Sequence, residues 1–470
     1  MKLWPFLPMV LLSGCMLGPN YERPETPGID SWHIDTAYQE TGSASVRDLD
    51  WSEIFNDEQL KTAIAAALEN NRDMLLAIER IQEARATARI ARSGIFPTFD
   101  LDLHGEREAE SGLTNDPAET ADQFTFAAAM AWEMDIWGKQ RRTNSAAFAE
   151  YLAAEYGAQA VRLSLIADVA LAYFELQGLE SRLDINKRTL IARERALEIA
   201  EKRHKGGLTS KLEVIQSDVE VAATRSQIPQ VEQSKLVVEN QLSLLMGLPP
   251  THLAMARDLE DHFIPESVTA GLASDLLERR PDIMQTEQNL IAASERVGAA
   301  KAALFPSFQL TGSLGYETED FDGLLDSDGN AWILELDVVQ PLFYSGARRA
   351  QLSAAESRFN QARLAYQKTV LEAFQETSNA LNQFHKSTET LNALSDLERS
   401  SAEYLRLAEK RYRNGVLAYI DVLDARRQLF DAQISVSQAR QEQLFALVNL
   451  YKAVGGGWNP KAISEIAESR

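Results

Sequence analysis

Four short stretches of the chain alternate apolar and polar residues, which is the period of a β-strand. In the first of them, Phe99, Leu101 and Leu103 alternate with two aspartates and a histidine. Each stretch has about the 9–11 residues of a membrane-spanning strand, although alternation alone fits a soluble sheet equally well. The predicted strands cover about residues 97–107, 124–136, 306–317 and 331–342.

Elsewhere apolar residues recur at spacings of three and four, which predicts amphipathic helices. Residues 139–205 contain no proline and residues 347–414 contain neither proline nor glycine, so each predicts one very long helix. At about 1.5 Å per residue, each would reach roughly 100 Å and needs helical neighbours along its apolar stripe. Gly207 and Gly415 mark the turns into return helices. The other predicted helices cover about residues 57–92, 212–246, 273–303 and 420–454.

This order of elements occurs twice, which indicates an internal duplication. Phe305 lies 209 positions after Phe96, and each begins a Phe-Pro pair at the start of a predicted strand. Gly415 follows Gly207 at nearly the same offset, 208 positions. Because one offset persists over separated blocks, we interpret each half of the chain as one copy of a single unit.

Composition is typical of an ordered protein and argues against two functional classes. The 47 basic and 69 acidic residues give a net charge of −22, which is unfavourable for binding nucleic acid. The six histidines show no metal-ligand spacing, and no nucleophile or phosphate-loop motif occurs, so we predict no enzyme, metal or bound cofactor. After the amino-terminal stretch, no apolar run approaches the roughly 18 residues that predict a transmembrane helix.

The single cysteine, Cys15, follows a short basic start and an apolar stretch, an order typical of an export signal. Leu12-Ser13-Gly14-Cys15 resembles the lipobox of bacterial lipoproteins. The resemblance implies that residues 1–14 are removed and that a lipid is attached to Cys15. Met16, where an aspartate would favour the inner membrane, favours the outer membrane. The alternative is an ordinary secretory signal with an incidental cysteine, although an unpaired cysteine is unfavourable in an exported protein.

Membrane strands would impose an assembly on this chain. The smallest known barrels have about eight strands, and four cannot close one. An open sheet edge is not tolerated in lipid, so several identical chains would have to share one barrel in a closed ring.

Several blocks of sequence, in a fixed order, point to one family. They are Gly18-Pro19-Asn20-Tyr21-Glu22-Arg23-Pro24, Asp50-Trp51-Ser52-Glu53-Ile54-Phe55-Asn56-Asp57, Glu278-Arg279-Arg280-Pro281-Asp282-Ile283, the two Phe-Pro strand starts, Arg411-Tyr412-Arg413-Asn414-Gly415 with Asp421-Val422-Leu423-Asp424-Ala425, and Gly455-Gly456-Gly457-Trp458. Together they resemble the outer-membrane efflux factors, the TolC-like channels, and specifically the lipoprotein branch that serves RND-type pumps.

The resemblance implies a mixed α and β membrane protein that works as a homotrimer in the outer membrane of a Gram-negative bacterium. Three chains with four strands each would form a 12-stranded barrel, continuous with a long helical barrel in the periplasm. The implied function is a passive exit duct for drugs or other small toxic solutes, joined by a periplasmic adaptor protein to an inner-membrane RND-type transporter. The alternatives are a channel of the same architecture for metal ions or type I protein secretion, an anchored enzyme, and a coiled-coil tether without a pore.

The resemblance also divides the chain. It implies a signal peptide (residues 1–14), a lipid-anchored and equatorial segment (15–56), a first repeat (57–248), an equatorial connection (249–272), a second repeat (273–456) and a tail (457–470).

Asp421 and Asp424 lie three positions apart, so they share one face of the return helix. The resemblance implies that they project into the pore and form its periplasmic gate. In a trimer they would form two acidic rings, which raise some carboxyl pKa values and attract cations. The alternative is that acids in a first helical turn simply favour the helix dipole. In the first copy Glu213 and Gln216 stand at the equivalent positions, so only one acid is kept.

Leu417 and Tyr419 occupy turn positions where some relatives carry a charged residue, so the resemblance implies no salt-bridge latch there.

Two further groups of residues are predicted to have functional roles. The implied contacts of the hairpin tips with the adaptor are Arg203, Gly207, Arg411, Tyr412 and Gly415. The acids expected to face the water-filled lumen, or simply to be solvated, are Glu133, Asp135, Glu335 and Asp337.

Overall fold

The computed structural model describes residues 16–25, 33, 44–45, 51–109, 120–253, 258–259, 262, 264, 268–269, 273–324 and 327–456. Cys15, the predicted signal peptide and the tail with Trp458 lie outside the described residues. The chain divides into two compact units. Unit 1 contains Met1–Glu25, Arg80–Glu155 and Gln285–Gln367, and unit 2 contains Thr26–Glu79, Tyr156–Met284 and Lys368–Arg470.

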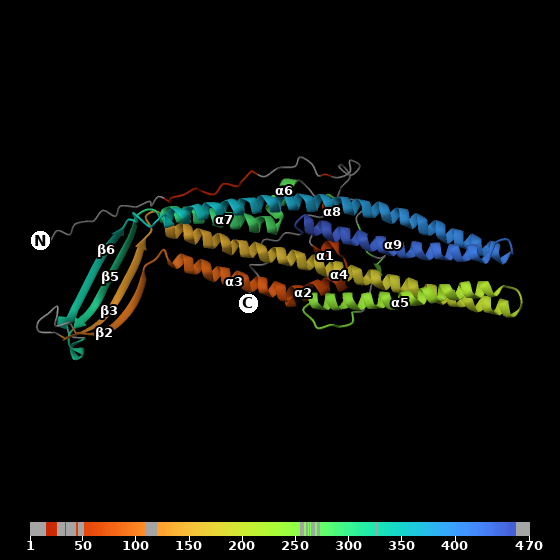
Figure 1. Ribbon diagram of the computed structural model, residues 1–470, viewed down its shortest axis with the longest axis horizontal. Coiled ribbons are helices and arrows are strands. Elements are labelled where there is room, and N and C mark those ends of the chain that lie inside the picture. Colours follow the sequence, from red (N-terminus) through yellow and green to blue (C-terminus); the bar gives the residue numbers. More distant parts are fainter. Residues whose placement is uncertain are drawn as a thin grey trace. The chain divides into compact units, whose positions relative to one another are not determined.

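Unit 1 contains a sheet of four antiparallel strands in the order β2-β3-β5-β6 (Figure 1). The two repeats are joined through the β3–β5 pair, where Glu133 lies opposite Gln309. Each repeat therefore contributes two neighbouring strands to one sheet, as the alternating pattern predicted. The strands are β2 (Thr98–Ala109), β3 (Thr120–Met134), β5 (Ser307–Thr318) and β6 (Asn330–Val339).

One face of this sheet is apolar and exposed. Leu101, Ala128, Leu314 and Trp332 form one row across the four strands, and the three large side chains are 69%, 61% and 74% exposed. The opposite face carries mostly polar and small residues, such as Asp102, Ser313 and Glu335, with Ile333 and Val339 as apolar exceptions. Since a contiguous apolar surface of this kind needs an apolar environment, the sheet is suited to contact lipid.

The first described residues of the chain, 16–25, also belong to unit 1. The Arg142 guanidinium donates to the Asn20 side chain at 3.2 Å. Tyr21 and Arg23 both donate to the Glu287 carboxylate, at 2.9 and 2.7 Å. The segment from Asn20 to Arg23, which the sequence assigned to an equatorial region, is thus fixed in the unit that contains the sheet.

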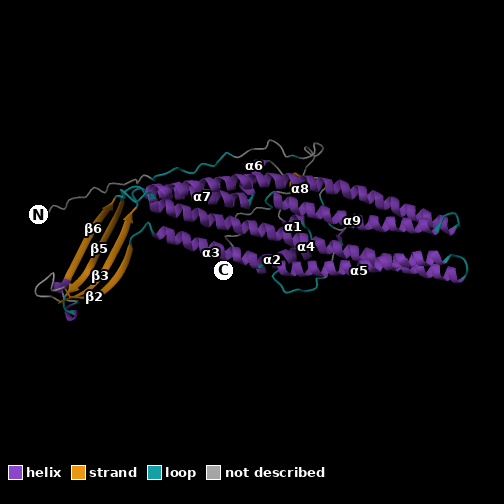
Figure 2. Cartoon of the chain, in the orientation of Figure 1, coloured by secondary structure: helices purple, strands orange, loops and turns teal. Residues whose placement is uncertain are grey.

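Two helical hairpins follow the strands. Helices α4 (Lys139–Lys205) and α8 (Ala347–Arg413) have 67 residues each, as their lack of proline predicted. Each turns back into a helix of 35 residues, α5 (Lys211–Leu245) or α9 (Tyr419–Ala453) (Figure 2).

The hairpin turns depend on two glycines. Gly207 and Gly415 both have a φ of +74°, the left-handed conformation that ends many helices. Leu208 N–H donates to the Arg203 carbonyl at 2.8 Å, and Val416 N–H donates to the Arg411 carbonyl at 3.0 Å. A Cβ at either glycine would have open space around it, so the backbone conformation alone requires glycine.

The sequence predicted a single helix at the start of each repeat. This prediction is wrong, because the structure has two helices there. Asn71 separates α2 (Glu58–Asn70) from α3 (Arg72–Ser93), and its side chain accepts from the N–H of Asp73 at 2.9 Å. In the second repeat Arg280 separates α6 (Ala273–Arg279) from α7 (Pro281–Ala302). The proline disfavours a helical conformation at the residue before it.

Unit 2 has an aromatic core around Phe55, which follows the short helix α1 (Trp51–Ile54). The Phe55 ring lies 5.8 Å from the Phe174 ring and 6.2 Å from the Tyr451 ring. Asp57 caps α2 and accepts a hydrogen bond from Tyr173 at 2.9 Å. A two-residue parallel pairing between β1 (Ala44–Ser45) and β4 (Val268–Thr269) completes the described elements of this unit.

Helix α4 also corrects the expectation that no apolar stretch of membrane-spanning length follows the signal. By length and composition it is the one helix of the described chain that passes such a test. Half of that stretch is buried in the structure.

Replacing Gly415 with alanine should destabilise the second hairpin turn by about 1–2 kcal/mol, because a Cβ is disfavoured at positive φ. Amide hydrogen exchange at the tip measures this loss of local stability. Gly206→Ala is the matched control, since its φ lies outside the left-handed region and a Cβ there meets neighbours only at 3.5 Å. Equal effects of the two substitutions would contradict the assignment.

Candidate functional site

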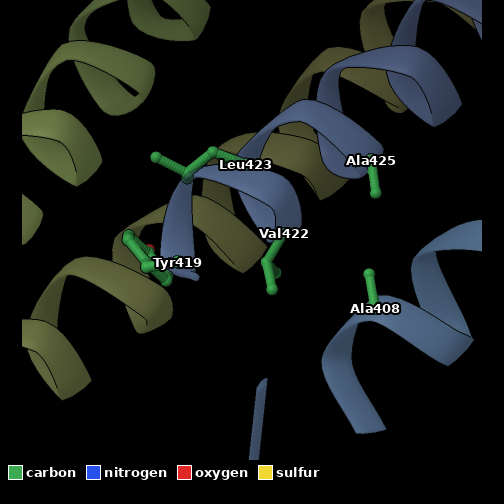
Figure 3. Close-up of a cluster of buried hydrophobic side chains, with 5 residues drawn as sticks. All are labelled: Ala408, Tyr419, Val422, Leu423 and Ala425. Carbon is green, nitrogen blue, oxygen red and sulfur yellow. The ribbon is translucent and has the colours of Figure 1, made fainter. Parts of the chain in front are cut away.

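The start of α9 is fixed by a cluster of buried side chains (Figure 3). Val422 is 1% exposed and Ala425 is fully buried, and Ala425 points toward Ala408 of α8. Tyr419 and Leu423 complete the buried face, at the spacing of three and four that one side of a helix presents. The rotation of α9 about its axis is therefore set by packing.

Asp421 and Asp424 lie between these buried positions and are partly exposed. Asp424 accepts a hydrogen bond from Gln428 at 2.7 Å, and an Arg427 nitrogen lies 3.4 Å from its carboxylate. Sequence reasoning overlooked Arg427, although its spacing of three from Asp424 was the signal. The charge of Asp424 is thus partly balanced by its own helix, whereas no such partner is described for Asp421.

The two hairpin tips are joined by Tyr412. Its hydroxyl donates to the Glu213 carboxylate of α5 at 3.2 Å and accepts from Arg203 of α4 at 3.0 Å. The Arg203 guanidinium also lies 5.2 Å from the centre of the Tyr412 ring. Burial and the nearby Glu213 charge raise the pKa of Tyr412, so the phenol remains a donor at neutral pH.

A second contact between the hairpins joins the hydroxyls of Ser217 and Tyr419, 2.7 Å apart. The predicted tip residues therefore divide into two sets. Arg203 and Tyr412 bind each other across the hairpins, whereas Gly207, Arg411 and Gly415 are exposed. Glu213, which the sequence identified only as the counterpart of Asp421, is a partner of Tyr412 instead.

The four strand acids also divide into two sets. Asp135 accepts from the backbone N–H groups of Gln140 and Arg141, at 3.0 and 2.9 Å, and so caps the start of α4. Its side chain is only 10% exposed, so it is a helix cap and not the open lumen acid that was expected. Glu133 lies 2.8 Å from Lys139 in the same turn. Glu335 and Asp337 are exposed on β6.

Among the described residues, no group of three or more histidine, cysteine, aspartate or glutamate side chains is arranged to hold a metal ion.

Comparison with known proteins identifies the family. The model of the outer membrane efflux protein family matches residues 63–248 and, separately, residues 272–456. The chain belongs to this family. The two matches cover the two repeats, which confirms the internal duplication.

Relatives along nearly the whole chain agree. The antibiotic efflux pump outer membrane protein ArpC of Pseudomonas putida is 34% identical over 454 residues, which are 95% of this chain and 94% of ArpC. The toluene efflux pump outer membrane protein TtgI of Pseudomonas putida is 34% identical over 469 residues, 97% of this chain and 98% of TtgI. The open-state structure of the Neisseria gonorrhoeae MtrE outer membrane channel matches with a TM-score of 0.86 and 30% identity, covering 94% of this chain and 98% of MtrE.

The chain is accordingly an efflux channel component of the outer membrane, with the mostly helical fold and four-stranded sheet of the TolC-like channels. An outer-membrane efflux duct is not an enzyme class.

The two sets of strand acids should respond differently to substitution. Asp135→Ala removes a helix cap and an ion pair and should lower the free energy of unfolding by about 1–2 kcal/mol. Asp337→Ala, the control at an exposed acid of β6, should change it by less than about 0.5 kcal/mol. Denaturant unfolding of the two purified variants measures both values. A similar loss in both would show that Asp135 is not a cap.

Proposed function

We propose that three copies of this chain form a passive duct through which an efflux pump expels small organic toxins across the outer membrane. The observation that carries this proposal is the sheet of unit 1, with one exposed apolar face and two outer edges. Within the described residues, the outer edges of β2 and β6 have no strand partner. Pairing β6 of one copy with β2 of the next closes three sheets into a 12-stranded barrel and satisfies those edges.

The same closure explains the two faces of the sheet. The apolar row through Leu101, Leu314 and Trp332 faces lipid, and the opposite face lines water. Glu335 and Asp337 on that face give the lumen an acidic wall near β6.

The periplasmic gate is assigned to Asp421 and Asp424. Packing at Val422 and Ala425 fixes the rotation of α9, so both acids lie on the helix surface that the hairpin core leaves free. Threefold symmetry then brings each acid into a ring, where carboxylates favour cations and narrow the path. The contacts of Tyr412 and Tyr419 with the first hairpin hold this end of α9 in place.

The proposed protein partner is inferred from the exposed hairpin tips. Leu208 and Val416 at the hairpin tips are 73% and 63% exposed, which suits them to contact an apolar surface on a periplasmic adaptor. The adaptor would connect the duct to an inner-membrane RND-type transporter, which supplies the energy. A lipid on Cys15 would anchor the chain to the membrane, and no cofactor is required.

The cargo class is proposed from the relatives. ArpC and TtgI are named for the efflux of antibiotics and of toluene, both small organic molecules. These names favour organic solutes over metal ions or secreted proteins as the cargo of this chain.

Single-channel recording tests the duct and the gate together. The mature protein in planar bilayers should show a small cation-selective conductance. The double variant Asp421→Ala with Asp424→Ala should conduct severalfold more and lose cation selectivity, because two acidic rings are removed. Glu442→Ala, an exposed acid farther along α9, should behave like the unmodified protein. A folded protein that never conducts would contradict the duct, and a double variant that matches the control would contradict the gate.

A further inference from the structure

Arg193 of α4 is a buried cation that neither the tips nor the gate uses. It is 7% exposed, and one guanidinium nitrogen donates to the Glu220 carbonyl at 3.0 Å and to the Thr224 hydroxyl at 2.6 Å. The same nitrogen lies 2.9 Å from the Glu220 carboxylate. Burial lowers the pKa of Arg193 and the Glu220 charge opposes that shift, which leaves a charged group at neutral pH. Both partners lie on α5, so these contacts hold the Arg193 side chain within the first hairpin.

Arg193 meets the second hairpin through a different kind of contact. Its guanidinium lies 5.2 Å from the centre of the Phe430 ring of α9, and Phe430 is itself 7% exposed. A cation over a ring face is attracted without a directional hydrogen bond. The ring can therefore tilt or slide against Arg193 while the attraction is kept.

A cavity of about 320 Å³ lies beside this contact. Ile185 of α4, Leu405 of α8 and Leu429 of α9 contribute to its wall, together with Arg193 and Phe430. The space opens to solvent and its wall also includes charged side chains such as Glu409 and Arg426, so the Phe430 side chain borders free volume on one side. The start of α9 is different, because Val422 and Ala425 are almost completely buried there.

The duplication places this buried cation in only one hairpin. At the offset of 208 positions, Ser401, Gln428 and Ala432 stand where the first copy has Arg193, Glu220 and Thr224. The second hairpin thus lacks these contacts. It presents the Phe430 ring to Arg193, together with the charges of Asp431, Arg426 and Arg427.

We propose that the Arg193–Phe430 contact is the pivot on which the gate end of α9 turns, so that Arg193 and Phe430 are positioning residues for Asp421 and Asp424. Phe430 lies six residues, about 9 Å, beyond Asp424 on the same helix. The hydrogen bonds of Tyr412 and Tyr419 hold the tip, and their release lets the gate end of α9 tilt about Phe430 while its packing on α8 at Val422 and Ala425 is kept. This inference rests on the proposed function, because it presumes a gate at the two acids.

Two substitutions of Phe430 with opposite expected effects on conductance test the pivot. The conductance of the full mature protein is recorded in planar bilayers. Phe430→Leu removes the ring and should raise the conductance severalfold, toward that of the variant lacking both gate acids. Phe430→Trp enlarges the ring, occupies part of the cavity and should lower the conductance below the unmodified level. Phe384→Leu is the control for loss of a buried ring, since Phe384 is fully buried on α8 away from the cavity. It should lower the melting temperature without changing the conductance.

Charge variants separate positioning from simple stability. Arg193→Met combined with Glu220→Gln removes the cation without leaving a buried acid unpaired, and should reproduce the Phe430→Leu conductance. Adding Phe430→Leu to that pair should change nothing further, because both act through one contact. Arg193→Lys keeps the charge and should restore most of the unmodified behaviour.

The outcomes distinguish the pivot from the duct. If the gate-acid double variant changes the conductance and the Phe430 variants do not, the pivot is wrong and the duct stands. If Arg193→Lys behaves like the double variant Arg193→Met with Glu220→Gln, the hydrogen bonds to α5 carry the effect, which also overturns the pivot. If no variant and no unmodified protein conducts, the proposed function itself has failed.

Discussion

Backbone hydrogen bonding at the edges of the four-stranded sheet is the constraint on which the rest of this molecule depends. β2 and β6 have 12 and 10 residues, and each has one side without a strand partner among the described residues. In water these groups would bind solvent, but the exposed apolar face suits the sheet to lipid, where each unsatisfied group costs several kcal/mol. In the proposed duct a single chain cannot meet that cost, so the strands themselves call for further copies, and closing the ring of copies creates the proposed passage.

The duplication provides two similar hairpins, which differ in the residues around their turns. Both turns use a glycine at the same φ, so the fold of the tips is shared. The residues around the turns are not shared, because Glu213 serves as an acceptor for Tyr412 while its counterpart Asp421 remains partly exposed. In the proposed gate, the first hairpin is the fixed partner and α9 of the second carries the two acids.

Much of this architecture could be predicted from the sequence, because its signals are local. Alternation at a period of two located all four strands, and the lack of proline located α4 and α8. The failures came from single side chains whose role depends on local bonding. Asn71 breaks a helix because its own side chain caps the next one, and Asp135 closes the start of α4 instead of facing open water. The Tyr412–Glu213 contact joins residues 199 positions apart, so no local pattern could reveal it.

The number of chains in the detergent-extracted protein tests the central claim most directly. Native mass spectrometry of the mature, lipidated protein measures that number without a functional assay. The account predicts a complex of three chains, because the edges of β2 and β6 are then all paired. A single chain that keeps its full strand content, as judged by circular dichroism of the same sample, would contradict it, since the edges would be satisfied without a partner copy.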